Sequence, residues 1–458
     1  MGKRLTGLDF GRGLAVLGMV FCHSFMGQVT GWNSTILFDL ASKTPIVLLV
    51  AVFCPVVVFC LMGSLFSFIT AICVTMSSIK IAAKGGNLIW RYVVMKLVFA
   101  FVIKFLEDFW GQWLNDYNIF KDERFGLPNV SLLYWSHTLD DVGFFSWFIP
   151  IVVYGLSKVP RLDYRAQMAI LTVIGVILLQ FNDVTIFYCR ELGSWFRSHE
   201  FYFFYYLTTK LDNGAFAILQ YLPFGFFGGA FGLLFTNTKD FKHYWVYCGI
   251  LSGLCIVCGI PNLFGDAATL VQDVFGWIKP KSYLFFMGAI QSIAMMICLQ
   301  LADNPKRPVE KRYRTIKRTT FLRRINALSL TAYIVEPRYN RTVLLFFRAL
   351  FGEGADRDKG TCLWPWYICL LYMLSCATLW AIICRLWERG HFRFSMEHQL
   401  SCIMSWLFQQ PYNKMDYKAN IYGPVEEIKQ ELAAQAPKKE GDGQQEAGEV
   451  EVVVQNSA

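Results

Sequence analysis

The feature that most limits how this chain can fold is a series of long apolar segments that are almost free of charge. Residues 45–76, for example, contain no Asp, Glu, Lys or Arg. A helix crosses the bilayer core with roughly 20 apolar residues, because every backbone polar group must be satisfied within the segment. The sequence therefore predicts an all-α, multi-pass transmembrane helical bundle of about ten helices. The predicted segments are residues 8–25, 45–76, 88–105, 132–156, 166–187, 215–235, 244–263, 282–302, 325–347 and 365–386.

The composition indicates an integral membrane protein. Apolar residues make up 55% of the chain and charged residues 17%, whereas soluble domains carry roughly 25% charged residues. This balance excludes a disordered protein, a coiled coil, a nucleic-acid-binding module and an ordinary cytosolic enzyme. Most of the 14 Cys residues lie inside apolar segments, where Cys acts as a small hydrophobic residue. We therefore expect neither a disulfide framework nor a metal site.

The distribution of Lys and Arg predicts how the bundle is oriented. Segment 303–324 carries nine bases and should face the cytoplasm, because basic loops stay on that side. With ten helices, both termini are then cytoplasmic as well. Further bases fall on the same side, at 80–84, 158–165, 239–242 and 385–393. The loops expected on the opposite side are 27–44, 107–131, 188–213, 264–281 and 348–364.

A change in composition predicts one membrane domain and one tail. The transmembrane domain should cover residues 1–410, and residues 411–458 should form a cytoplasmic, acidic, largely disordered tail. Residues 425–458 contain eight acidic and three basic residues. Within the membrane domain, residues 225–232 read GFFGGAFG, and this Gly-x-x-x-Gly spacing lets helices approach closely. Internal helix packing is the simpler interpretation, and contact with a second copy in a homodimer is the alternative.

Ionisable side chains in the first apolar segment are candidates for function, because charge inside a membrane is costly. Asp9 and Arg12 are three residues apart, so they can pair on one helix face. His23 follows Arg12 by about three helical turns, or roughly 16 Å, and faces a similar direction. Taken alone, Arg12 is explained equally by an anchor at the cytoplasmic face, and His23 by a buried core histidine.

A second group of ionisable residues lies in the outer half of the fourth segment. It comprises His137, Asp140 and Asp141. An Asp here could orient His23 or His137, as carboxylates do in acid–base sites. The alternative is that the helix begins later and these residues lie in water at the membrane surface.

The ninth segment carries a third group. Glu336 is followed by Arg338 and Arg341, and this set is either part of a substrate path or a structural ion pair within the bundle. Arg323 and Arg324 open the same segment at the cytoplasmic face. They either bind phosphate groups or follow the positive-inside rule.

Residues 4–23, RLTGLDFGRGLAVLGMVFCH, resemble the opening of a superfamily of transmembrane acyltransferases. This superfamily includes heparan-α-glucosaminide N-acetyltransferase and bacterial glycan O-acetyltransferases. The resemblance rests on the spacing of Leu8-Asp9, Arg12-Gly13, Ala15, Met19-Val20 and His23. Weaker similarities to the same superfamily occur at 55–68, 221–235, 323–336 and 387–398.

The resemblance implies an enzyme that transfers an acyl group, acetyl by default, from cytoplasmic acyl-CoA to a hydroxyl or amine of a glycan or other small acceptor. In that scheme Arg12 helps to hold the acyl-CoA, with Asp9 beside it. Arg323 and Arg324 are further candidates for binding its phosphates. His23 acts as general base or carries the acyl group. Acetyl-CoA is a donor substrate here, and no permanently bound cofactor is expected.

The sequence departs from the superfamily at one position, and two other functions are compatible with it. The corresponding helix of the superfamily often ends in His, whereas this chain has Glu336. Intramembrane ionisable residues also build proton relays, so a multi-pass transporter or flippase is the alternative function. The absence of a clear internal repeat counts against that alternative. A degenerate acyltransferase scaffold with a receptor or structural role is the third possibility.

Overall fold

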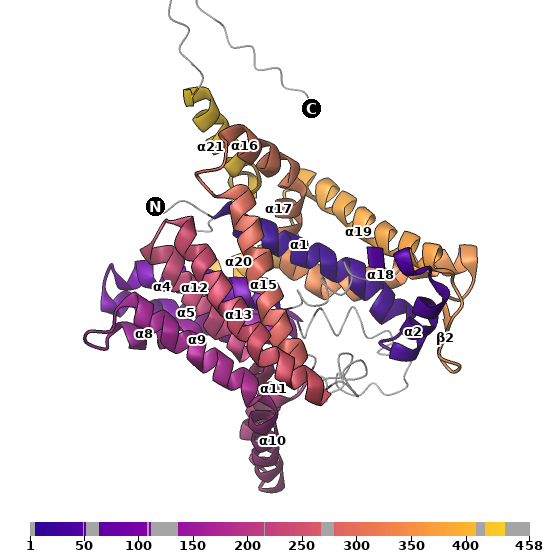
Figure 1. The fold of residues 1–458 in the computed structure, drawn as a ribbon, viewed down its shortest axis with the longest axis horizontal. Coiled ribbons are helices and arrows are strands. Elements are labelled where there is room, and N and C mark those ends of the chain that lie inside the picture. The colour runs from indigo at the N-terminus through magenta and orange to yellow at the C-terminus, as the bar shows by residue number, and fades with distance from the viewer. Residues whose placement is uncertain are drawn as a thin grey trace, which may run out of the picture.

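The computed structural model describes residues 5–48, 50–51, 64–107, 110, 136–214, 216–266, 279–408 and 417–435. In these residues the protein consists of eighteen helices and one short β-hairpin (Figure 1). The prediction of an all-α fold is therefore confirmed. The predicted second segment lies partly outside the described residues, and so does most of the predicted loop 107–131.

Seven helices are long and apolar enough to cross a membrane. They are α1 (Thr6–His23) with its continuation η1 (Ser24–Val29), α4 (Leu65–Ala82), α8 (Thr138–Ser157), α12 (Ile218–Asn237), α13 (Phe241–Asp266), α15 (Lys281–Ala302) and α19 (Trp366–Arg389). An eighth span is formed if α9 (Tyr164–Gln180) and α10 (Asn182–Ser198) are taken together. The chain is thus an integral, multi-pass membrane protein.

The number of predicted spans exceeds the number that length and composition support in the described residues. The third and ninth predicted segments do form helices, α5 (Gly86–Leu106) and α18 (Ser329–Phe351). Neither is among the membrane-length apolar helices. In α18 the apolar run is interrupted by Glu336, Arg338 and Arg341. The fifth predicted segment is broken, since α9 and α10 meet at an angle of 71°.

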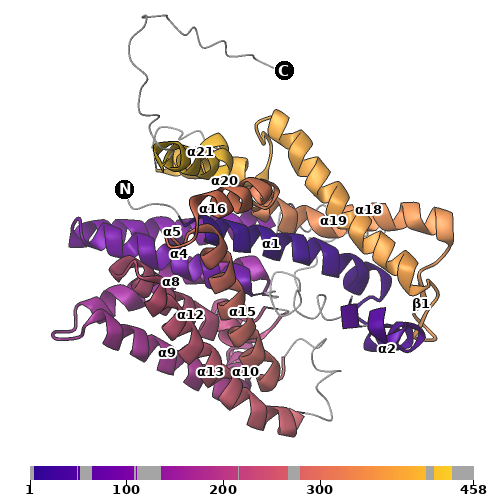
Figure 2. The same cartoon turned by 45° about the horizontal axis from the view of Figure 1, so that its top comes forward.

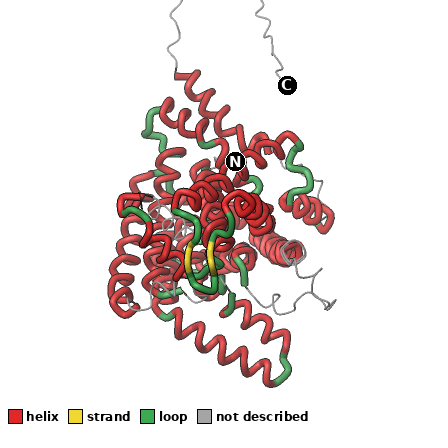
Figure 3. The backbone as a smooth tube through the Cα atoms, turned by 90° about the vertical axis from the view of Figure 1, so that its right-hand side faces the viewer, coloured by secondary structure: helices red, strands yellow, loops and turns green. Residues whose placement is uncertain are grey.

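The remaining elements are shorter and connect or cover the long helices. They are α2 (Ser34–Lys43), α11 (Tyr202–Asp212), α16 (Val309–Arg318), α17 (Thr320–Asn326), α20 (Met396–Leu407), α21 (Tyr417–Gln435), β1 (Ala355–Asp356) and β2 (Thr361–Cys362). The two strands pair antiparallel. Figure 3 shows this hairpin at the end of the molecule that lies on the right in Figure 1.

The Gly-rich helix α12 is the centre of the larger helix group. Buried side chains of α4, α8, α9, α13 and α15 surround it, and 94% of its most apolar stretch is buried. A Cβ atom at Gly228 would lie 2.5 Å from the carbonyl oxygen of Phe68, and one at Gly232 would lie 2.6 Å from Cβ of Thr75. The glycines therefore let α4 pack directly on α12. Internal packing is the interpretation of this motif that the structure supports.

Helix α1 lies between that group and a second one formed by α17, α18 and α19 (Figure 1). Its glycines allow the approach, since a Cβ at Gly13 would lie 2.1 Å from the carbonyl oxygen of Leu322. Asp303, which follows α15, accepts hydrogen bonds from the backbone N–H of Thr6 at 3.0 Å and of Gly7 at 2.6 Å. A carboxylate at a helix N-terminus is favourable, because the helix dipole is positive there.

The predicted disordered tail contains a packed helix. Residues 417–435 form α21, which lies beside the basic helix α16 (Figure 2). Ile421 and Ile428 are buried, and Arg312 of α16 pairs with Glu431 at 3.2 Å. Within the predicted tail, residues 417–435 are therefore helical and packed, because buried apolar side chains and one ion pair hold them against α16. The boundary predicted at residue 411 stays a prediction.

Candidate functional site

His23 lies where the first helix changes its hydrogen-bonding pattern. It is the last residue of α1, and residues Ser24–Val29 continue as the π-helix η1. Short π-helical stretches occur frequently at functional sites, since they redirect side chains within an otherwise regular helix. The His23 side chain is 36% exposed, although its helix is packed on several sides. The imidazole is thus reachable.

The imidazole of His23 is joined to the carboxylate of Glu336 on α18. Nδ1 lies 3.2 Å from Oε2, and the Glu336 side chain is only 4% exposed. Asn340, one turn further along α18, donates its side-chain N–H to the other oxygen, Oε1. The same amide nitrogen donates to the carbonyl oxygen of Val20 at 3.3 Å. The carboxylate is therefore fixed by a second donor while it faces the imidazole.

An aromatic ring also packs against the imidazole. Trp32 lies edge-on to His23, with ring centroids 5.3 Å apart. The chain reaches this position through Gly31 at φ +60° and Trp32 at φ +63°. A bulky residue in the left-handed region costs about 1–2 kcal/mol. Such strain persists only when the surrounding structure holds it, and it occurs often at functional sites.

Arg12 is placed differently from the predicted pair with Asp9. The guanidinium carbon lies 5.3 Å from the centroid of the Phe66 ring, and Nε is buried with no hydrogen-bond partner. Asp9 instead accepts a hydrogen bond from Asn326 of α17 at 3.1 Å. The side chain of Asp9 thus joins α1 to α17, and the Arg12 guanidinium retains an unused buried donor.

Arg323 and Arg324 are engaged within the protein. Arg323 is 2% exposed and donates to the carbonyl oxygen of Ile421 at 3.0 Å. Arg324 pairs with Glu388 of α19 at 2.6 Å. Both residues therefore help to hold α17, α19 and α21 together, and their predicted contact with donor phosphates stays a prediction.

In the group on α8, Asp141 is buried, whereas His137 and Asp140 are half-buried. The helix begins at Thr138, so His137 precedes it, and Oδ2 of Asp140 accepts the His137 backbone N–H at 2.8 Å. Lys210 and Lys104 lie 3.3 and 3.4 Å from the same oxygen. In the described residues no hydrogen bond links this group to His23. None of the three residues is exposed, and none is hydrogen-bonded to His23, the candidate base.

Asp141 differs from Asp140, because it has no hydrogen-bond or ion-pair partner among the described residues. Its side chain is fully buried, and neither carboxylate oxygen forms a hydrogen bond within the described part of the chain. Burying a polar group without a hydrogen-bond partner costs free energy. A group of this kind in a folded protein therefore has a functional or structural reason.

The segments that resemble the acyltransferase superfamily contact one another. Residues 4–23 meet 323–336 through Asp9–Asn326 and through His23–Glu336. Segment 387–398 meets 323–336 through Glu397, which accepts the backbone N–H groups of Leu330 at 2.6 Å and Thr331 at 3.1 Å. Burial raises the pKa of Glu397. The start of α18, and hence Glu336, is therefore positioned by a distant carboxylate.

Sequence reasoning missed Asn340, Trp32 and Tyr372. The Tyr372 hydroxyl donates to the backbone carbonyl of Asn340 at 2.9 Å. A signal for Asn340 was present, because it follows Glu336 by four residues and so shares its helix face. Arg338, predicted on the substrate path, is half-buried on the same helix.

Comparisons with known proteins do not assign this site. No protein-family model matches the chain, and neither curated proteins nor solved structures give a match. The interpretation therefore rests on the residues and their geometry.

Proposed function

We propose that this protein is an integral-membrane acyltransferase that moves an acyl group, by default acetyl, from cytoplasmic acyl-CoA to a hydroxyl or amine of a glycan or other small acceptor. The observation that carries the proposal is the His23–Glu336 contact, 3.2 Å between Nδ1 and Oε2. A buried carboxylate beside a partly exposed imidazole is the arrangement that acid–base catalysis uses. The similarity of residues 4–23 to acyltransferases supports the same reaction.

In the proposed reaction, His23 acts as the general base. The Glu336 carboxylate accepts the Nδ1–H, which holds the ring in the tautomer with a basic Nε2. Nε2 removes the proton from the acceptor hydroxyl or amine as that group attacks the thioester carbonyl. The carbon–sulfur bond then breaks, and the CoA thiolate takes the proton from the imidazolium. Attack of Nε2 on the thioester, forming an acyl-imidazole, is the variant of this scheme that places the acyl group on His23 first.

Arg12 is the proposed contact for the donor. Its buried Nε has no partner in the described residues, and guanidinium groups pair well with phosphate. The CoA phosphates near Arg12 would leave the pantetheine arm to reach along α1 toward His23. We also propose that the protein has ten spans in a domain of residues 1–410. Both termini then lie in the cytoplasm, where the donor is found.

The experiment is an acyl-transfer assay with the full-length protein in detergent or proteoliposomes. Release of CoA from acetyl-CoA is followed with and without a panel of amino sugars and neutral sugars. We expect acceptor-dependent release that is abolished in His23→Ala. Glu310→Gln removes a carboxylate from an exposed position of α16 and serves as the matched control for Glu336→Gln. Wild-type protein that is folded but never releases CoA would rule the proposal out.

A transporter or flippase is the second candidate, and one observation favours it. Asp141 is fully buried without a hydrogen-bond partner, close to Asp140 and its two lysines. Buried carboxylates of this kind carry protons in pumps and transporters. Proton-coupled uptake in vesicles that is lost in Asp141→Asn, without any response to acyl-CoA, would support this function over acyl transfer.

A further inference from the structure

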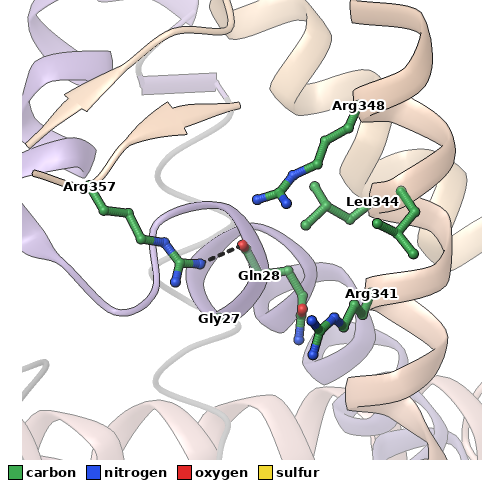
Figure 4. A pocket seen from close by; sticks show the side chains of 7 residues that line it. Gly27, Gln28, Arg341, Leu344, Arg348 and Arg357 are labelled. Carbon is green, nitrogen blue, oxygen red and sulfur yellow. Dashed lines mark hydrogen bonds between the residues drawn. The ribbon is translucent and has the colours of Figure 1, made fainter. Parts of the chain in front are cut away.

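A cavity lies between η1, α18 and the β1–β2 hairpin (Figure 4). Its volume is about 320 Å³, and its lining includes Gln28, Leu344 and the three arginines Arg341, Arg348 and Arg357. Pockets that hold small ligands have volumes from roughly 300 Å³ upward. The cavity is therefore large enough for one sugar ring or one lipid headgroup.

The three arginines come from two separate parts of the chain. Arg341 and Arg348 are two turns apart on α18 and share one face of that helix with Leu344. Arg357 belongs to the turn between β1 and β2. Figure 4 shows the Arg348 and Arg357 side chains reaching toward each other from opposite walls, with Arg341 beside Gln28. The tertiary fold thus brings the guanidinium groups to one cavity.

Contacts around the cavity hold Arg357 in place. Its Nη2 donates to the backbone carbonyl of Gln28 at 3.0 Å. Gly31, at φ +60°, leaves room for the guanidinium, since a Cβ there would lie 3.0 Å from its central carbon. On the opposite wall, Arg348 pairs with Glu353 at 3.0 Å, and Glu353 itself is not part of the lining.

The charge of the lining is one-sided. Among the described residues that line the cavity there are three arginines and no carboxylate. Like charges brought together repel, and a bound anion removes that cost. Guanidinium groups pair bidentately with carboxylate, sulfate and phosphate, which adds geometric selectivity to the attraction.

One lining residue connects the cavity to the segment that carries Glu336. Gln28 lines it and donates through Nε2 to the carbonyl oxygen of Pro337 at 3.3 Å, directly after Glu336 in the chain. It also lies at the end of the α1–η1 span that is far from Asp303 and the basic segment 303–324. A helix of these 24 residues is roughly 35 Å long. The cavity is therefore on the membrane side opposite to the proposed donor site.

We propose that this cavity binds an oxyanion, a carboxylate, sulfate or phosphate group, carried by the acceptor. The identity of the ligand as an acceptor rests on the proposed acyl transfer, whereas the anion site itself does not. An anion held by Arg341, Arg348 and Arg357 would place the rest of the molecule beside the Glu336–Pro337 turn and His23. The acceptor is then acidic, either a water-soluble sugar acid or sugar phosphate, or a lipid with a phosphate headgroup.

The test measures anion binding to full-length protein without acyl-CoA. One arm titrates glucuronate and glucose 6-phosphate by calorimetry, with glucose as the neutral control. The other arm reconstitutes the protein in nanodiscs with phosphatidylglycerol or phosphatidylcholine and measures retained lipid by native mass spectrometry. Arg348→Gln and Arg357→Gln are compared with Arg314→Gln, which removes one charge from an exposed position of α16 on the basic segment. Thermal unfolding establishes that each variant is folded.

We expect an anionic probe to bind the wild type and the Arg314→Gln variant, and glucose not to bind. Affinity should fall about tenfold or more in Arg348→Gln and in Arg357→Gln, because each removes a charge-assisted contact. Binding of the sugars assigns a soluble acceptor, and selective retention of phosphatidylglycerol assigns a lipid one. The proposal is overturned if no anionic probe binds, or if both variants bind like Arg314→Gln.

Failure of this inference is distinguishable from failure of the proposed reaction. If anions bind as expected but no acceptor stimulates CoA release, the site stands and acyl transfer is excluded. If acetyl transfer proceeds equally well to neutral and acidic sugars and is unchanged in Arg348→Gln, the reaction stands and the anion site is excluded.

Discussion

His23 and Glu336 are 313 residues apart in the chain, yet Nδ1 of the imidazole lies 3.2 Å from Oε2 of the carboxylate. The contact joins the end of α1 to the middle of α18, directly before Pro337. Glu336 is buried and also accepts the Asn340 amide, so its position is fixed from two sides. This geometry makes the carboxylate the orienting group for His23.

Replacing Glu336 by Gln should lower the rate of acetyl transfer by roughly 10²–10⁴-fold, because the ring loses the charge that stabilises the imidazolium. The Michaelis constant for acetyl-CoA should change little, since the proposed donor contact is at Arg12. Initial rates of CoA release over pH 6–9 measure both quantities. Asn340→Ala should lie between the wild type and Glu336→Gln. Equal rates in wild type and Glu336→Gln would show that the carboxylate is structural.

Replacing Arg12 by Ala should weaken acetyl-CoA binding about 10- to 100-fold, because a charge-assisted bond to phosphate contributes roughly 1.5–3 kcal/mol. Calorimetric titration of the detergent-solubilised protein measures the dissociation constant. Arg12→Lys keeps the charge without the planar guanidinium and should recover part of the affinity. Arg314→Ala, on the same predicted side of the membrane, is the control. An unchanged dissociation constant in Arg12→Ala would remove Arg12 from the donor site.

The sequence was sufficient to predict the long helices and two of the site residues. Apolar length is a local signal, and it identified every membrane-length helix that the structure describes. It also predicted spans at α5 and α18, which form helices but are not among the membrane-length apolar helices of the described residues. In α18 the apolar run is interrupted by Glu336, Arg338 and Arg341. His23 and Arg12 stood out for a local reason as well, since each is an ionisable residue within an apolar segment.

The partners of these residues could not be predicted, because they are set by tertiary contacts. The sequence left open whether Glu336 pairs with Arg338 or Arg341 or belongs to a substrate path. Its hydrogen-bond partners among the described residues are His23 and Asn340. Arg324 was expected near the donor phosphates and pairs with Glu388. The residue pattern within one segment does not show which residues of distant segments will contact it.

The pKa of Asp303 predicts that the stability of the protein depends on pH. Burial raises it to about 6, against the opposing effect of the Gly7 and Thr6 N–H groups. Because the folded protein holds this proton more tightly than the unfolded chain, stability should fall as pH rises from about 4 to 6. The contribution lost is on the order of 3 kcal/mol. In Asp303→Asn, this loss of stability between pH 4 and 6 should disappear.

Midpoints of thermal unfolding at pH 4, 5, 6 and 7 test the Asp303 prediction. The matched control is Asp240→Asn, since the Lys242 N–H lowers the pKa of exposed Asp240 below its usual range. The Asp240 carboxylate should therefore give a small slope of opposite sign, with stability lost as pH falls. A wild type and an Asp303→Asn variant with parallel profiles would contradict the assignment.

Replacing Gly228 by Ala should destabilise the protein, because a Cβ atom there would lie 2.5 Å from the Phe68 carbonyl oxygen and 2.7 Å from Cβ of Ala71. Both α12 and α4 must shift, and overpacking of this kind costs about 1–3 kcal/mol or more. Gly249 on α13 is the control, since a Cβ there meets nothing within 4 Å. Gly249→Ala should be neutral or stabilising by about 0.5–1 kcal/mol, because Ala is the better helix former.

Thermal unfolding and size-exclusion chromatography in detergent separate the two interpretations of the Gly-rich helix. Internal packing predicts that Gly228→Ala lowers the unfolding midpoint and leaves the mass of the folded particle unchanged. A dimer contact predicts a change in that mass at an unchanged midpoint. Because Gly228 contacts Phe68 and Ala71 of its own chain, the structure favours the first result. A stable Gly228→Ala variant with altered mass would place the glycine motif at an interface between two copies.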